Sequence, residues 1–296
     1  MQHILDALRA DKPKRVILDT DAYNEVDDQF AIAYAMRSSD RIDLLSINAA
    51  PFRNSRASDP AEGMERSYHE AIKLVRMTDP QADIPVYRGS YRFMTDRHVP
   101  VESEAAQNII RTALAADEPI YVLAIGAITN VASALLMCPE IAKRIIVIWL
   151  GGNALEWRGG DMRDFNLKQD IPAAQVVYDS AAPFIQIPCL GGCEILSTSV
   201  AELQYYLGGK NALCDYLVDI VANYPQDPYA WSKVIWDIAG VALFAKPSAL
   251  SPVILPRPIL SDNGYAVCDT ARPPFIYIRS MNRDAIFADL FTKLVK

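Results

Sequence analysis

A short apolar run, a dense group of carboxylates and a second apolar stretch follow one another near the start of the chain. Residues 16–18 are Val-Ile-Leu, a β-branched and apolar run that predicts a buried strand. Residues 27–36 predict a helix with several apolar side chains available for burial. Five carboxylates lie within ten residues here: Asp19, Asp21, Glu25, Asp27 and Asp28. A strand, a polar loop and a helix in this order predict the first βα unit of an α/β fold.

The carboxylates of this segment repel one another unless something offsets their charge. A helix N-terminus offsets only about 0.3–1 kcal/mol per charge, and a bound cation offsets far more. Ligands of open α/β sheets bind outside the carboxyl ends of the strands, which is where this acidic segment falls. A solvated acidic loop that caps the helix is the alternative interpretation of the same residues.

Further strands and helices alternate along the chain after this unit. Strands are expected over residues 42–47, 84–87, 120–125, 145–150 and 184–188. Helices are expected over residues 1–10, 61–76, 104–116, 129–137 and 173–178. The alternation predicts an α/β fold whose open, mostly parallel sheet has right-handed crossovers and helices on both faces.

The C-terminal third has a different pattern. Helices are expected over residues 200–224, 234–245 and 282–294, and short strands over residues 265–268 and 275–278, with a proline-rich connection over residues 247–258. No repeat or linker interrupts the chain, so residues 1–296 are expected to form a single domain.

Composition excludes several classes of partner. The net charge of −7 disfavours nucleic-acid binding. The longest apolar stretch, residues 121–137, is too short and too interrupted to span a membrane. Nothing resembles a signal peptide, and five cysteines without paired short spacings fit reduced thiols. A cytoplasmic protein that binds neither membrane nor nucleic acid is expected.

Oxygen donors recur at the predicted strand ends. They are Asp21, Asp27 and Asp28, backbone carbonyls near Ile125, then Asn153, Asp164, Asn166 and Asp170. Asp237 lies in an otherwise apolar segment, where a carboxylate is costly unless it is paired, metal-bound or capping the helix that follows. Carboxylates and carbonyls without a His or Cys cluster favour a hard cation such as Ca²⁺. The three histidines, at positions 3, 69 and 98, fall outside these segments.

An ordered set of motifs carries a resemblance. Asp19-Thr-Asp21 and Asp27-Asp28 are similar to the Asp-x-Asp-Pro-Gly-x-Asp-Asp motif of the inosine-uridine preferring nucleoside hydrolase family, with a middle that is two residues longer. Residues 124–130 are similar to its Gly-x-Leu-Thr-Asn segment. Leu150-Gly-Gly-Asn153, Asp164-Phe-Asn166 and the Asp237 segment follow in the family's order.

The resemblance implies a nucleoside-hydrolase-like fold and a chemistry. The expected reaction is calcium-dependent hydrolysis of the N-glycosidic bond of a ribonucleoside or related N-riboside, giving free base and ribose. It implies Ca²⁺ ligands at Asp21, Asp28, Asp237 and the carbonyl of Ile125, with Asp21 as general base. It implies substrate contacts from Asp27, Asn153, Asp164 and Asn166, and Trp236 is expected to contact the substrate by stacking on its base. A homodimer or homotetramer is expected.

Several positions depart from the family's pattern. Trp236 stands where many members have the histidine that protonates the leaving base. Ala50 and Arg158 stand where asparagines are usual, and Asp164 replaces a glutamate. Arg97, His98 and Arg158 are alternatives for the acid, and Trp157, Tyr23 and Tyr229 are further candidates for stacking on a base.

Two other functions compete with this one. Asp19-Thr-Asp21 has the spacing of a haloacid-dehalogenase-type phosphatase motif, but Tyr23 stands where that motif has Thr or Val. A non-catalytic ribose or nucleoside binder on the same fold is the other alternative, and release of free ribose separates it from an enzyme.

Overall fold

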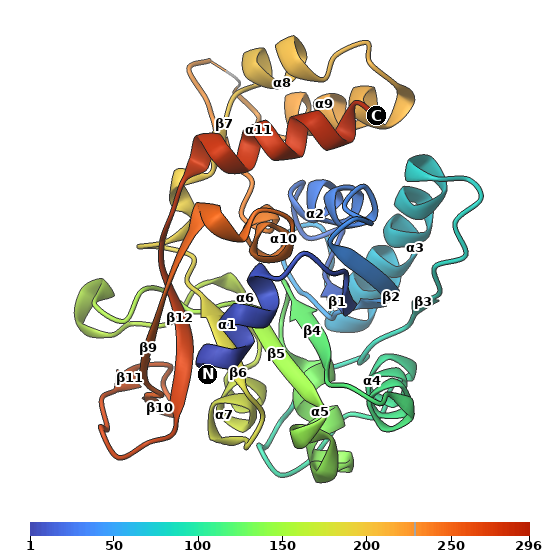
Figure 1. Cartoon of the computed structure of the whole chain (residues 1–296). Coiled ribbons are helices and arrows are strands. Elements are labelled where there is room, and N and C mark those ends of the chain that lie inside the picture. Colours follow the sequence, from blue (N-terminus) through green and yellow to red (C-terminus); the bar gives the residue numbers. More distant parts are fainter. Residues whose placement is uncertain (228) are drawn as a thin grey trace.

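A computed structural model describes residues 1–227 and 229–296, and its centre is one large sheet (Figure 1). The eight strands lie in the order β3-β2-β1-β4-β5-β6-β12-β9. Their bounds are β1 Lys14–Thr20, β2 Ile42–Ala49, β3 Val86–Tyr87, β4 Ile120–Ala124, β5 Ile145–Leu150, β6 Phe184–Ile187, β9 Leu250–Pro256 and β12 Pro274–Met281. All neighbours are parallel except β12 and β9. The predicted α/β fold with a mostly parallel sheet is confirmed.

Helices cover both faces of the sheet because alternate strand residues point to opposite sides. Val16 and Leu18 join one apolar core with α1 Gln2–Arg9, α2 Asp28–Met36, α3 Pro60–Thr78, α10 Ile238–Ala245 and α11 Arg283–Leu294. Ile17 joins the other core with α4 Glu104–Ala115, α5 Thr129–Met137 and α7 Ile171–Asp179. Among the described residues, no helix has both the length and the apolar character needed to cross a bilayer.

The helix predicted over residues 200–224 is wrong as one element. The structure has α8 Val200–Tyr206 and α9 Ala212–Ala222, separated by a turn that contains Gly209 at a φ of 70°. Asn211 starts α9 by accepting a hydrogen bond from the Cys214 backbone N–H at 2.8 Å. These helices lie beside α11 (Figure 1), whose last residues receive a hydrogen bond from Asn211 to the Leu294 carbonyl at 3.0 Å.

The helix predicted over residues 234–245 begins later than expected. Residues Lys233–Val234 form β8, which pairs with β7 Ser197–Thr198. The helix α10 starts at Ile238, so that Asp237 occupies its N-cap position and Trp236 precedes it. This boundary decides where two predicted site residues point.

The proline-rich connection predicted over residues 247–258 is a strand for most of its length. β9 contains Pro252 and Pro256 and forms the antiparallel edge of the sheet beside β12. An edge strand tolerates proline because one side of its backbone needs no partner in the ladder. The predicted strand over residues 265–268 is the short β11 Ala266–Val267, paired with β10 Ile259–Leu260.

Asn130 ties together the strand ends that carry the acidic loop. Its Nδ2 donates to Asp19 Oδ2 at 2.9 Å and to the Ala49 carbonyl at 3.2 Å, and its Oδ1 accepts from the Ser90 backbone N–H at 2.8 Å. Burial raises the pKa of Asp19 to about 7, and the hydrogen bond from Asn130 opposes that rise. Asn130 therefore links β1, β2 and the start of α5.

Replacing Asn130 by alanine is expected to lower the free energy of unfolding by about 2–3 kcal/mol, because buried acceptors lose their donor. Chemical denaturation measures the change. Asn223→Ala is the matched control, since the exposed Asn223 amide donates, among the described residues, only to the Asp219 carbonyl; it should cost less than about 0.5 kcal/mol. Equal costs for the two variants would contradict the structural role of Asn130.

Candidate active site

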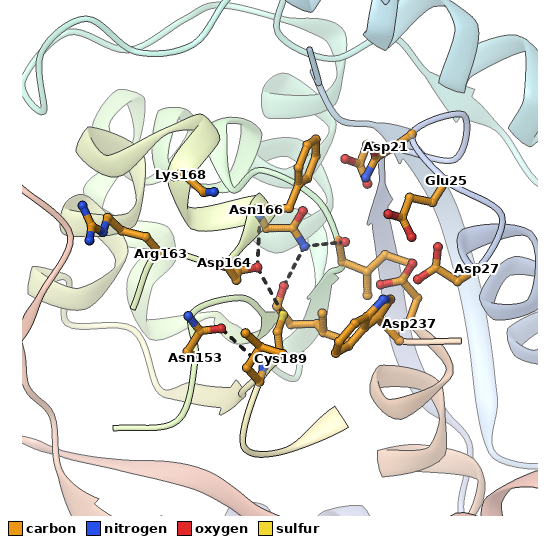
Figure 2. Close-up of a pocket in the computed structure, with 16 residues that line it drawn as sticks. Asp21, Glu25, Asp27, Asn153, Arg163, Asp164, Asn166, Lys168, Cys189 and Asp237 are labelled. Atoms are coloured by element: carbon orange, nitrogen blue, oxygen red, sulfur yellow. Dashed lines mark hydrogen bonds between the residues drawn. The ribbon is translucent and has the colours of Figure 1, made fainter. Parts of the chain in front are cut away.

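A cavity of about 310 Å³ opens at the carboxyl ends of the central strands (Figure 2). It brings together residues that are far apart in the sequence. The predicted site residues that line it are Asp21, Asp27, Ile125, Asn153, Asp164, Asn166, Trp236 and Asp237. Asp28 does not line the cavity and lies behind it, against Asp27 and Asp237. The rule that ligands bind at strand carboxyl ends therefore located the cavity correctly.

Three buried carboxylates meet at one end of this cavity. Asp27, Asp28 and Asp237 each offer an oxygen, and these oxygens all lie within 4.8 Å of one another. Asp237 stands at the N-cap of α10 but makes no side-chain cap hydrogen bond. Asp27 stands in the same way at the N-cap of α2. The alternative interpretation of Asp237 as a helix cap is therefore wrong, because its carboxylate is turned to the other two.

The crowding of these groups changes their acidity. Burial raises the pKa of Asp237 well above its usual value, and the charges of Asp27 and Asp28 raise it further. Burial and the neighbouring Asp27 raise the pKa of Asp28 to about 7, while a hydrogen bond from Thr20 opposes the rise. Three buried carboxylates with no histidine or thiolate among them are the donor set of a hard cation.

Asp21 faces the same cavity from the loop after β1. It is 1% exposed, and its Oδ2 has no hydrogen-bond partner among the described residues. Burial raises its pKa well above the usual value, and the charges of Asp28 and Asp27 add to the effect. An orphaned buried carboxylate oxygen beside three others fits a bound cation or water. Asp21 is not one of the three carboxylates that lie within mutual ligating distance.

Gly126 makes room for Asp21. A Cβ at this position would lie 2.9 Å from the Asp21 carboxyl carbon and 3.1 Å from the Ala50 side chain. Any larger residue would displace the Asp21 carboxylate. The predicted segment 124–130 thus needs glycine at position 126 because a side chain there would collide with Asp21. Asn130 of the same segment holds the strand ends together through its hydrogen bonds.

The opposite end of the cavity is a network of hydrogen bonds around Asp164 (Figure 2). Its Oδ1 accepts from the backbone N–H groups of Gly152 at 2.7 Å and Leu167 at 3.0 Å. Its Oδ2 accepts from the Asn166 N–H at 3.0 Å and the Cys189 thiol at 3.1 Å. All four partners come from the protein, so this carboxylate holds the start of α6 Phe165–Gln169 in place.

Asn166 and Asn153 also contact backbone. Asn166 Nδ2 donates to the carbonyl oxygens of Ile125 at 2.9 Å and Leu150 at 3.0 Å. The Ile125 carbonyl, a predicted ligand, is thereby fixed at the cavity wall. Asn153 Nδ2 donates to the Asp161 carbonyl at 3.1 Å, and its Oδ1 accepts from the Leu190 N–H at 3.3 Å.

Two charged residues at the acidic end were not predicted as site residues. Lys233 is buried on β8, pairs with Glu25 Oε2 and lies 3.8 Å from Asp27 Oδ1. Glu25 lines the cavity and comes from the stretch in which the acidic motif is two residues longer than usual. The longer motif could have indicated that Glu25 is a site residue. The sequence near Lys233 gives no indication that this lysine pairs with Glu25.

The alternative candidates for the leaving-group acid and for stacking on the nucleobase do not line the cavity. Arg97, His98 and Arg158 are absent from its wall, and no described residue of that wall is a histidine. Tyr23 lies beneath the Arg56 guanidinium, at 4.3 Å from ring centre to guanidinium carbon. Tyr229 is 89% exposed. Of the proposed stacking residues, Trp236 alone lines the cavity, and Trp157 does not.

Sequence comparison finds relatives that are named as a uridine nucleosidase and as ribonucleoside hydrolases. Probable uridine nucleosidase 2 of Arabidopsis thaliana is 24% identical over 284 residues, covering 87% of this chain and 83% of the relative. Non-specific ribonucleoside hydrolase RihC of Escherichia fergusonii is 26% identical over 257 residues, covering 78% of this chain and 79% of the relative.

Solved structures agree in fold. The purine-preferring ribonucleoside hydrolase from Gardnerella vaginalis has a TM-score of 0.79 at 20% identity, over 95% of this chain and 98% of that chain. The plant nucleoside hydrolase PpNRh1 has a TM-score of 0.74 at 20% identity, over 96% of this chain and 99% of that chain. The predicted nucleoside-hydrolase-like fold is confirmed.

The family model described as inosine-uridine preferring nucleoside hydrolase matches residues 16–272. That range contains the acidic loop, the cavity residues and Asp237. The predicted resemblance is confirmed, and with it the class of enzyme, an N-ribosylhydrolase. The chain belongs to the inosine-uridine preferring nucleoside hydrolase family.

Proposed function

We propose that this protein hydrolyses the N-glycosidic bond of a ribonucleoside or related N-riboside, with Ca²⁺ as its metal, to give free base and ribose. The observation that carries the proposal is the buried group of Asp27, Asp28 and Asp237 beside the unpartnered Asp21 oxygen, at the wall of a cavity. The relatives named as ribonucleoside hydrolases support the substrate class.

Asp21, Asp28, Asp237 and the Ile125 carbonyl would hold the cation. Each offers oxygen, which Ca²⁺ prefers. A bound Ca²⁺ supplies positive charge that orients a ribose diol and lowers the pKa of a water molecule. The fit rests on buried carboxylates whose pKa values are raised by burial and by one another's charge.

The side chains around that position have distinct roles. Asp21 takes a proton from the attacking water. Asp27 accepts hydrogen bonds from a sugar hydroxyl, as does Asn166 Oδ1, which receives no hydrogen bond from the described residues. Asn153 and Asp164 already contact backbone or Cys189 with their polar atoms, and we assign them the positioning of the sugar pocket.

The charge of the pocket suits the transition state. Departure of the base leaves positive charge on the ribose ring, which nearby carboxylates stabilise. A rigid set of hydrogen bonds around Asp164 and Asn166 keeps the sugar in one orientation, which contributes through pre-organisation.

Ribose release from a panel of nucleosides in ¹⁸O-labelled water tests the proposal. Hydrolysis predicts reducing sugar that carries one ¹⁸O atom at its anomeric carbon. Release of base only when phosphate is added would indicate phosphorolysis. Nucleoside binding without release would indicate a non-catalytic binder. Either result would overturn the proposed reaction.

Trp236→Ala should weaken binding of the base more than it slows cleavage of nitrophenyl riboside. An indole N–H cannot serve as an acid at neutral pH, and stacking contributes roughly 0.5–1.5 kcal/mol beyond area burial. The measurement is KM and kcat for inosine and nitrophenyl riboside, with Trp157→Ala, outside the cavity wall, as control. A strong preference of the parent for inosine, with a sharp acid limb in its pH profile, would contradict this role.

We also propose a homodimer or homotetramer in the cytoplasm, acting on small molecules without nucleic acid or membrane. Five free cysteines and the absence of a disulfide among the described residues fit a reducing compartment. Light scattering of the purified protein measures the oligomeric state, and a monomer would contradict the first part.

A further inference from the structure

Carboxylates outnumber cations at the acidic end of the cavity. Asp21, Glu25, Asp27 and Asp237 line it, and Asp28 lies directly behind. The nearby ammonium is that of Lys233, which is buried behind Glu25 and absent from the cavity wall. A divalent cation together with Lys233 would carry fewer charges than these five carboxylates. The acidic end therefore keeps an excess of negative charge toward the substrate.

The same cavity has no histidine among its described lining residues that could protonate a leaving base. Breaking the bond between the anomeric carbon and nitrogen leaves the electron pair on the base. A neutral base then departs as an anion unless it gains a proton. The described wall contains no histidine, Trp236 donates no proton as an acid, and the Cys189 thiol already donates to Asp164 at 3.1 Å.

We propose that the cavity prefers N-ribosides whose base is permanently cationic, such as an N-ribosylpyridinium or an N7-alkylated purine, and that Glu25 recognises this charge. The inference rests on the proposed hydrolysis. Water oxygen bonds to the anomeric carbon, and Asp21 takes one water proton and passes it to solvent. The electron pair of the broken bond neutralises the base, which leaves uncharged. No acid is needed, and atoms and charge balance.

Hydrogen bonds hold the backbone around Glu25, and one oxygen of its carboxylate pairs with Lys233. The Arg56 guanidinium donates to its carbonyl at 2.7 Å, and Asn54 Nδ2 donates to Asn24 Oδ1 at 2.7 Å. Its Oε2 pairs with Lys233, while its Oε1 has no partner among the described residues, and the side chain is 35% exposed. Trp236 adds an aromatic face in the same cavity, and such faces attract cations.

Two cationic residues lie at the other end of the cavity. If their charge decided the selectivity, the cavity would prefer anionic rather than cationic substrates. Arg163 is held by Asp161, with Nε at 2.7 Å from Oδ1. Lys168 is exposed, lines the cavity and forms no ion pair within the described parts of the chain. If Lys168 set the selectivity, an anionic riboside such as orotidine would be preferred.

The experiment uses two readouts on the calcium-loaded full chain. The first is kcat/KM for 7-methylguanosine, guanosine, orotidine and the neutral, activated nitrophenyl riboside. The second is competitive inhibition of nitrophenyl riboside cleavage by 1-methylnicotinamide and by nicotinamide, which differ in charge. Ratios within one variant are independent of the fraction of folded enzyme.

We expect 1-methylnicotinamide to inhibit about tenfold more strongly than nicotinamide, as a cation desolvated on an aromatic face does. Glu25→Gln should shrink this ratio about fivefold, since it also leaves Lys233 without its partner, and Glu25→Asp should preserve it. Glu118→Gln, an exposed control paired with Lys12 at 3.4 Å, should leave it unchanged.

Equal inhibition by 1-methylnicotinamide and nicotinamide would overturn the inference, as would faster cleavage of orotidine than of 7-methylguanosine. In either case, release of ribose would still support the proposed hydrolysis. A Glu25→Gln variant with the parent's inhibition ratio would remove Glu25 from the recognition. Failure to release ribose from every riboside, nitrophenyl riboside included, would overturn the proposed function itself and the inference with it.

Discussion

Asp21→Asn should leave the fold intact and lower turnover by the roughly 10²–10⁴-fold expected for loss of a general base. The amide has almost the same shape as the carboxylate, so the space left by Gly126 still accommodates it. It cannot accept a proton from water at neutral pH. Because Asp21 Oδ2 has no partner among the described residues, the substitution removes no hydrogen bond that the fold requires.

Steady-state kinetics on nitrophenyl riboside measure this loss, with circular dichroism as the check on folding. Asp117→Asn is the matched control, because Asp117 is exposed and precedes β4 at the opposite end of the strand from the cavity. It should turn over substrate at the parent's rate. Parent-like turnover in Asp21→Asn would assign the base to another residue.

Asp28→Ala should abolish the stabilisation that Ca²⁺ confers. A ligand that binds only the folded state at a hundred times its Kd stabilises that state by about 2.7 kcal/mol. Asp28 is one of the proposed Ca²⁺ ligands and lies beside Asp237, a second one, so its removal breaks the donor set. Elemental analysis should find one Ca²⁺ per chain in the parent, and calorimetry should find a calcium-dependent rise in Tm. Retained metal in the variant would refute the assignment.

The effect of Ca²⁺ on Tm should also grow with pH. Burial raises the pKa of Asp27 to about 6 and that of Asp28 to about 7, above the ordinary value of 3.8. Without metal, the folded state therefore binds these protons more tightly, and its stability falls as pH rises from about 4 to about 7. Ca²⁺ needs the ionised carboxylates, so its contribution increases across the same range. A shift in Tm that is equal at pH 5 and pH 8 would contradict this linkage.

Most of the sheet was predictable because buried parallel strands are continuous apolar runs. β4 and β5 are entirely buried, and both were expected within a residue of their bounds. β9 was missed because its prolines resemble a connection, and an edge position removes the penalty that proline has inside a sheet. The break between α8 and α9 was missed because the apolar pattern continues on both sides of it.

The cavity was predictable for the same reason that the sheet was. Polar groups that directly follow parallel strands lie at the same edge of the sheet. The sequence therefore predicts that Asp21, the Ile125 carbonyl and Asn153 lie close together, as they do in the cavity. Pairings between distant segments carry no such local signal. Lys233 meets Glu25 only because β8 crosses back to the acidic loop. Asp164 meets Cys189 only because the loop after β6 closes on α6.

The most direct test of the account is the initial rate of ribose release as chelator-treated enzyme is titrated with Ca²⁺. We expect the treated enzyme to be inactive and the rate to rise until one Ca²⁺ is bound per chain, while Asp28→Ala shows no rise. Full ribose release by the metal-free protein would contradict it, because the buried carboxylates would then act without the cation that their arrangement fits.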